Sequence, residues 1–197
     1  MKFRQYRLGG LFMALAVTVL ILSGCASTSS RNVSAADLQK RQQALARSDL
    51  LIVPGNRIGP VRLGMAWDEV IAMLGKPDFS YINTGDPTKI STQLKYFSLN
   101  MEISFDTSAT PSVTLIRVLA YGKHPFTFGT VTWAEFEPIE TAFHTDEGIG
   151  LGASSFEVAR KYGSYESNGM VAMDYKQLGL YFIVTKDHRI WSISTRN

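Results

Sequence analysis

An internal duplication constrains the fold of this chain more than any other feature of the sequence. Residues 58–75 and 148–163 share one layout, in which a glycine precedes a short segment containing Glu-Val and a second glycine closes it. The matching positions are Gly64, Glu69, Val70 and Gly75 in the first segment and Gly152, Glu157, Val158 and Gly163 in the second. Such self-similarity predicts that one structural unit occurs twice along the chain.

Each of the two segments is expected to form a short helix. The apolar residues of the first segment recur at the spacing of a single helix face, at Trp67, Val70, Ile71 and Leu74. In the second segment, Ser154 and Glu157 have the spacing of a capping box at a helix N-terminus. Gly75 and Gly163 stand where a helix commonly ends on a left-handed residue.

A meander of strands should follow each helix. Apolar residues occur at every second position, which is the pattern of a strand with one buried face. The strand segments are residues 101–105 and 113–121 in the first copy and residues 180–184 and 190–195 in the second. We therefore expect an α+β fold of two tandem repeats, residues 50–122 and 123–197. Each repeat would be a short helical segment packed on an antiparallel sheet of about three to four strands.

The first 25 residues have the pattern of a bacterial lipoprotein signal. Basic residues precede an apolar run at 8–22, which has the length of a signal peptide's hydrophobic region, and Leu22-Ser23-Gly24-Cys25 looks like a lipobox. We expect residues 1–24 to be removed and Cys25 to be the site of lipid attachment, so that the protein reaches a membrane through acylated Cys25. Cys25 is the only cysteine, so no intramolecular disulfide is expected. The alternative is an uncleaved membrane anchor in which the cysteine has no role.

Residues 25–49 are expected to form a flexible tether. Ser34 could cap a short helix over residues 35–47, but the low apolar content of this segment predicts a solvated or marginal helix. Lys40, Arg41 and Arg47 would either contact anionic lipid head groups or form the solvated face of a spacer, and we favour the spacer.

The charge balance argues against a nucleic-acid partner. The chain has 20 Lys and Arg residues against 17 Asp and Glu residues, a net charge of +3. Lys2, Arg4 and Arg7 would be lost with the signal, which leaves 17 basic residues against 17 acidic ones. A polybasic binding surface is therefore not expected.

Motifs of common catalytic and metal sites are missing from the sequence. His124, His144 and His188 lie far apart and lack the spacing of metal ligands. The glycine-dense segment 148–152 lacks the lysine of a phosphate-binding loop and matches a turn in the first copy. We predict no enzymatic activity, no cofactor and no metal.

A second apolar side of the predicted sheets is the main candidate for binding. If Ile116, Val118 and Ala120 face the helices, alternation places their neighbours on the opposite side. An antiparallel sheet with one solvated face does not require apolar residues there, so these residues either bury an interface between the copies or form a partner-binding surface. The candidate partner-binding residues are Leu115, Arg117, Leu119, Tyr121, Tyr181 and Ile183.

The segment Leu63-Gly64-Met65, the following Glu-Val helix and Leu74-Gly75-Lys76-Pro77 resemble the SmpA/OmlA family of small outer-membrane lipoproteins. Tandem copies of this unit are similar to those of β-lactamase inhibitor proteins. The chain departs from the usual pattern at Ala66, where a Ser or Thr cap is expected, and at Ser155, which replaces the aromatic residue of the first copy.

The resemblance implies a lipid-anchored, non-enzymatic protein with a protein partner in outer-membrane or envelope maintenance. The alternative is an inhibitor of a periplasmic or secreted enzyme. Ala26 follows the lipobox cysteine in place of the Asp that tends to retain lipoproteins at the inner membrane. The expected location is therefore the bacterial cell envelope, with the protein anchored in the outer membrane and facing the periplasm.

Overall fold

The computed structural model describes residues 33–83, 91–120, 127–128, 131–132, 142–167 and 172–196 of the chain. The described residues belong to the second of the two units into which the chain divides, Arg31–Asn197. The fold and the candidate sites below belong to the second unit.

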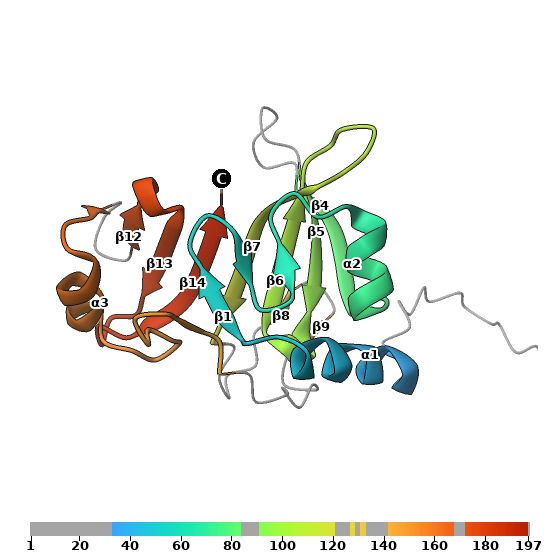
Figure 1. The fold of residues 1–197 in the computed structure, drawn as a ribbon, viewed down its shortest axis with the longest axis horizontal. Helices are drawn as coiled ribbons and strands as arrows, with labels where there is room; N and C mark the ends of the chain where they lie inside the picture. Colours follow the sequence, from blue (N-terminus) through green and yellow to red (C-terminus); the bar gives the residue numbers. More distant parts are fainter. Residues whose placement is uncertain are drawn as a thin grey trace, which may run out of the picture. The chain divides into compact units, whose positions relative to one another are not determined.

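This unit is an α+β fold in which sheet predominates, as the sequence predicts (Figure 1). Its described helices are α1 (Ala35–Ala46), α2 (Trp67–Leu74) and α3 (Ser155–Tyr162). None of these helices is long and apolar enough to cross a bilayer.

An antiparallel sheet of eight strands forms the centre, in the order β11-β12-β13-β14-β7-β6-β5-β4. Its first four strands in the sequence are β4 (Phe79–Asn83), β5 (Ser91–Tyr96), β6 (Met101–Phe105) and β7 (Val113–Leu119). The other four are β11 (Glu166–Ser167), β12 (Ala172–Tyr175), β13 (Leu180–Val184) and β14 (Ile190–Arg196). Short 3₁₀ helices, η1 (Phe97–Leu99) and η3 (Lys176–Leu178), link β5 to β6 and β12 to β13.

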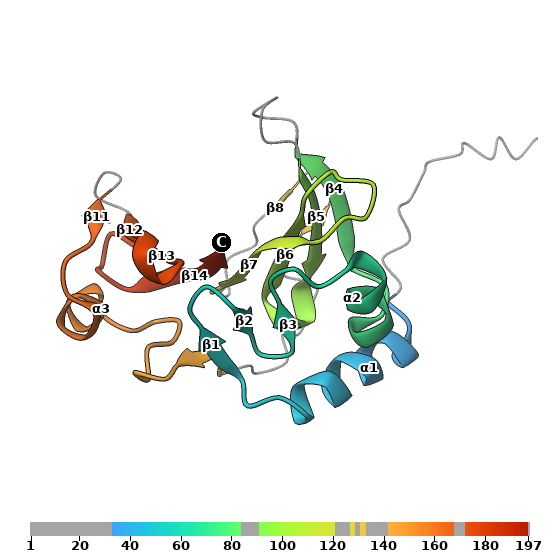
Figure 2. The ribbon, with the colours of Figure 1, turned by 45° about the horizontal axis from the view of Figure 1, so that its top comes forward.

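A smaller sheet contains β10 (His144–Thr145), β1 (Leu51–Val53), β2 (Arg57–Ile58) and β3 (Val61–Arg62), in that order. Strands β1 and β10 pair in parallel, although they lie far apart in the sequence. Strands β8 (Thr127–Phe128) and β9 (Val131–Thr132) form a separate antiparallel pair. Figure 2 shows β1, β2 and β3 below the region where β14 meets β7.

The large sheet differs from the expectation of sheets with three to four strands. Strand β7 pairs directly with β14, with Ile116 opposite Thr195 and Val118 opposite Ile193. This pairing satisfies backbone groups that would otherwise stand at two open sheet edges, so one continuous sheet replaces two smaller ones.

The core lies on one face of the large sheet. A row of cross-strand partners runs over β6, β7, β14, β13 and β12, and each member is almost fully buried. The row consists of Met101, Val118, Ile193, Phe182 and Met173. In α2, Val70 and Leu74 are buried while Trp67 and Ile71 are partly exposed, so the predicted stripe does face the core.

The first helix is docked on the fold and not marginal, although most of its residues are exposed as expected. Ser34 caps α1 as predicted, since its side chain accepts a hydrogen bond from the Asp37 amide at 3.1 Å. Arg41, however, is fully buried and donates to both carboxylate oxygens of Asp78 at 3.0 Å. This ion pair fastens α1 to the rest of the fold, so Arg41 cannot reach a lipid head group.

Candidate functional site

The candidate site is the face of the eight-stranded sheet opposite the core. Arg117 lies on this face, because its neighbours Ile116 and Val118 are fully buried on the other. Cross-strand pairing puts Arg117 between Glu102 on β6 and Ser194 on β14, and Ser194 is opposite Tyr181 on β13. Cross-strand partners share a face, so these four side chains form one row.

A polar network occupies the middle of this face. Arg117 donates through Nε to the Ser194 hydroxyl at 3.1 Å and lies 3.6 Å from a Glu102 oxygen. The other Glu102 oxygen accepts from the Lys95 ammonium at 2.6 Å. Lys95 and Glu102 are each about one-twentieth exposed, so their ion pair is largely shielded from solvent. The Arg117 side chain is 28% exposed and is the accessible end of the network.

Tyr181 and Arg196 form the second part of the face. The Arg196 guanidinium carbon lies 5.4 Å from the centre of the Tyr181 ring, and Arg196 donates to Asp174 at 2.7 Å. A cation over an aromatic ring at this distance is attracted by the ring electrons. We call the partly exposed residues Leu115, Arg117, Tyr181, Ile183 and Arg196 the outer sheet face.

The six residues selected from the sequence have different places in the structure. Leu115, Arg117, Tyr181 and Ile183 lie on the outer sheet face. Leu119 is only 3% exposed, opposite the fully buried Ser192, so it is withdrawn as a partner contact. Tyr121 lies outside the described residues.

The sequence also allowed these residues to bury an interface between the copies. The two halves of the sheet meet in its plane, through hydrogen bonds between β7 and β14. The outer face is therefore not needed to join them. It is also more polar than expected, because Lys95, Glu102 and the serines of β14 alternate with core residues.

The sequence analysis did not detect this network. Its members come from β5, β6, β7 and β14, which the sequence does not place side by side. The usable signal was the charged residue between apolar neighbours in each of three strands: Lys95, Glu102 and Arg117.

One described acidic side chain and two described histidines have clear structural contacts. Glu69 accepts from the amide of Ala66 at 3.0 Å at the start of α2. His144 lies 2.8 Å from the Ala142 carbonyl, and the His188 ring is 5.2 Å from that of Phe156. In the part of the chain that the structure describes, no three His, Cys, Asp or Glu side chains form a group that could hold a metal ion.

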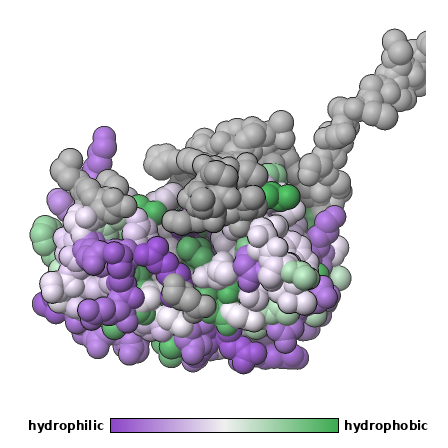
Figure 3. All heavy atoms as spheres, turned by 90° about the horizontal axis from the view of Figure 1, so that it is seen from above, coloured by the Kyte–Doolittle hydropathy of each residue, from purple (hydrophilic) through white to green (hydrophobic). Residues whose placement is uncertain are grey.

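Hydropathy is mixed over the surface seen from above. Figure 3 shows mainly hydrophilic and weakly polar residues among those described there, with smaller hydrophobic areas between them.

Comparison of the chain with family models, with curated proteins and with solved structures finds no match.

Proposed function

We propose that this chain is a lipid-anchored, non-enzymatic envelope protein that binds a protein partner through the outer sheet face. The observation that carries the proposal is the placement of Arg117, Tyr181 and Arg196 together on the sheet face away from the core. Arginine and tyrosine are enriched among the residues that dominate binding energy at protein interfaces.

The network beneath Arg117 supports this role. Ser194 and Glu102 hold the guanidinium in one position before any partner arrives. Fixing a side chain in advance reduces the entropy lost on binding. Leu115 and Ile183 add partly exposed apolar area, as expected near the centre of an interface.

The proposal includes two tandem αβ repeats. Support comes from the order of elements, which is α2-β4-β5-η1-β6-β7 in one half and α3-β11-β12-η3-β13-β14 in the other. The same order, together with the motifs around Gly64 and Gly75, underlies the resemblance to SmpA/OmlA lipoproteins and to β-lactamase inhibitor proteins. On this basis the protein acts in envelope maintenance, anchored through Cys25 in the outer membrane and facing the periplasm.

The test is partner capture from intact cells with a photo-activated cross-linking residue at position 181. We expect one or a few specific adducts, which Arg117→Ala should reduce while the unfolding curve stays close to that of the parent. Arg160→Ala, at an exposed position on α3, is the matched control and should leave the adducts unchanged.

The identity of the adduct separates the two function classes. Barrel-assembly or cell-wall machinery would support a scaffold in envelope maintenance. A single soluble enzyme, inhibited by the purified protein, would support an inhibitor instead. Adducts that persist equally in Arg117→Ala would contradict binding through this face.

A further inference from the structure

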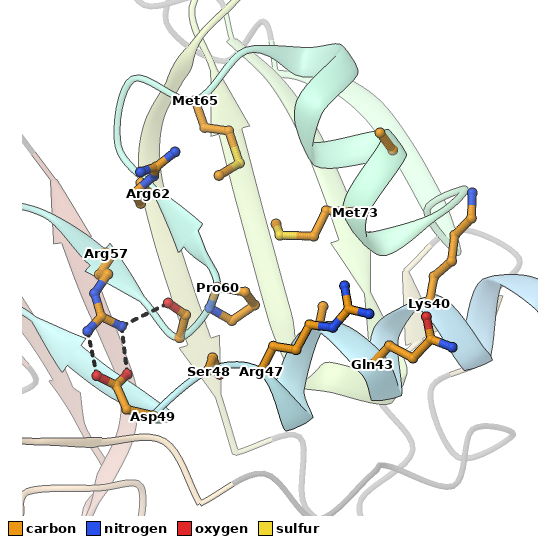
Figure 4. Close-up of a pocket in the computed structure, with 13 residues that line it drawn as sticks. Lys40, Gln43, Arg47, Ser48, Asp49, Arg57, Pro60, Arg62, Met65 and Met73 are labelled. Atoms are coloured by element: carbon orange, nitrogen blue, oxygen red, sulfur yellow. Dashed lines mark hydrogen bonds and ion pairs between the residues drawn. The ribbon is translucent and has the colours of Figure 1, made fainter.

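A groove of about 710 Å³ lies between α1, α2 and strands β2 and β3 (Figure 4). Its floor is apolar, since Met65 and Met73 point toward each other across the space (Figure 4). Lys40 and Arg47 from α1 and Arg62 from β3 stand at its sides. A cavity of this size is in the range that binds a small molecule or the side chains of a peptide.

One face of α1 forms a wall of the groove. Lys40, Gln43, Ala44 and Arg47 line it, and their spacing places them on a single helix face. This wall is held in place from behind, because Arg41 on the same helix is fully buried against Asp78. The two cations of the wall are therefore carried by a fixed element.

Of the four cations that line the groove, one has an acidic partner among the described residues. Arg57 is paired with Asp49 at 2.6 Å, and its hydrogen bonds hold the pKa of that carboxyl well below its ordinary value. Among the described residues, no acidic side chain lies within ion-pair distance of Lys40, Arg47 or Arg62. Three positive charges without an ion-pair partner in the described part of the chain thus surround an apolar floor.

We propose that this groove binds an acidic amphipathic helical segment of a protein partner. Apolar side chains of the segment rest on Met65 and Met73, whose unbranched thioethers adapt to different shapes. Carboxylates of the segment, next to its apolar side chains, form ion pairs with Lys40, Arg47 and Arg62. The groove is a second binding surface, lined by helices and the small sheet, and the inference does not depend on lipid anchoring or on the outer sheet face.

The shape and spacing favour a peptide over a membrane surface. Met65 is only 8% exposed, so the floor is recessed where a flat head-group layer cannot reach it. Lys40 and Arg47 are separated by about 10 Å along α1 at 1.5 Å per residue. Acidic residues seven apart in a helical segment have the same separation, which matches the wall.

The experiment uses residues 26–197, which contain the whole compact unit, with methionine methyl groups labelled for NMR. The probe is a synthetic 16-residue helix with leucines on one face and glutamates beside them. We expect the Met65 and Met73 methyl signals to shift on titration. The Met101 signal should not move, because this side chain is 1% exposed in the core.

Substitutions at the groove test the two kinds of contact separately. Arg47→Glu with Arg62→Glu should weaken peptide binding by about tenfold or more, since exposed ion pairs contribute up to about 1 kcal/mol each and reversal adds repulsion. Ala72→Trp, at an exposed position of α2 in the groove lining, should block the peptide sterically. Arg160→Glu is the matched charge reversal on α3 and should change affinity less than about twofold.

Three outcomes would overturn the inference. The first is the absence of any shift at Met65 and Met73, and the second is equal binding of a peptide with lysines in place of the glutamates. The third is a shift caused by a water-soluble dihexanoyl phospholipid with an anionic head group but not by the peptide, which would assign the groove to lipid. Arg117→Ala should leave peptide binding intact, so failure of the outer sheet face and failure of the groove are distinguishable.

Discussion

Arg41 places a positive charge inside the protein and gives each of its three side-chain nitrogens an acceptor. Its Nε donates to the Leu74 carbonyl, one terminal nitrogen to Asp78 and Ser98, and the other to the Lys76 carbonyl at 2.6 Å. The guanidinium carbon also lies 4.9 Å from the centre of the Tyr96 ring. A buried charge is tolerated because its hydrogen bonds replace those of water.

Arg41→Met should therefore be strongly destabilising. Removing one partner of a buried ion pair leaves the other unpaired, at a cost of about 3–5 kcal/mol. The measurement is urea-induced unfolding of residues 26–197 followed by circular dichroism. Lys40→Met, on the exposed neighbour, should change the free energy of unfolding by less than about 0.5 kcal/mol. A loss below about 1 kcal/mol in Arg41→Met would show that the pair contributes little.

The burial of Arg41 could not be predicted from the sequence. The sequence shows a basic residue in a polar helix, and the partner that explains it, Asp78, follows a different helix. Arg117 was selected correctly for its side of the strand, because alternation depends on neighbours alone. Leu119 lies on the same side as Arg117 but is buried, and alternation predicts the side of a strand and not the exposure of each residue on it.

Asp106 should remain ionised to a lower pH than an ordinary aspartate. Hydroxyls of Ser108 and Ser112 donate to its two oxygens at 2.6 and 2.8 Å and lower its pKa to about 2. A carboxyl with a lowered folded-state pKa stabilises the fold above its unfolded pKa, and this contribution is lost as the pH falls through about 2.

The check on Asp106 is an NMR titration of the carboxyl carbon. Ser108→Ala combined with Ser112→Ala should return the midpoint toward 3.8. Ser164→Ala, an exposed serine elsewhere, should leave the midpoint unchanged. An unchanged midpoint in the double variant would mean that other groups set this pKa.

At the scale of the element, α2 and α3 differ in how they begin. Ser154 caps α3 by accepting a hydrogen bond from the Phe156 amide at 3.3 Å. Ala66 occupies the same position in α2 with a similar extended backbone but has no side-chain acceptor. Gly75 and Gly163 end the two helices with positive φ angles of 73° and 80°.

Ala66→Ser should stabilise the protein, and Ser154→Ala should destabilise it. A serine at the N-cap contributes about 0.5–2 kcal/mol relative to alanine, so we expect changes of about 1 kcal/mol in opposite directions. Urea unfolding of both variants measures this difference. The same sign of change in both would show that Ala66 is constrained by contacts other than the missing cap.

The sequence was sufficient for the three described helices and for strands β6, β7, β13 and β14, because stripes, closing glycines and alternation are local patterns. It was not sufficient for the continuous sheet. That sheet depends on pairing between residues 115–119 and 192–196, and either strand could have paired elsewhere or remained at an edge. The small sheet also depends on pairing between segments distant in the sequence, since β1 pairs in parallel with β10.

At the scale of the molecule, the proposed lipid anchoring depends on one atom, the sulfur of Cys25. Cys25→Ala should abolish membrane attachment through acyl chains, because the chain has no other thiol. The measurement is metabolic labelling with a fatty-acid analogue, followed by membrane fractionation. Ser27→Ala, in the same segment, should keep the label. Acyl label on Cys25→Ala would refute the lipobox interpretation.

The central place of β14 has a consequence for how the chain acquires its structure over time. β14 is the last described strand in chain order, yet it lies between β13 and β7. Until residues 190–196 have been synthesised, and exported where export applies, β7 has an open edge. An open edge can pair with another molecule, so the growing chain is exposed to aggregation at this stage. Joining the halves also requires contacts between residues distant in the sequence, which are typical of slow folding. The strand that completes the sheet is therefore the point at which a chaperone or a pause in synthesis would have the greatest effect.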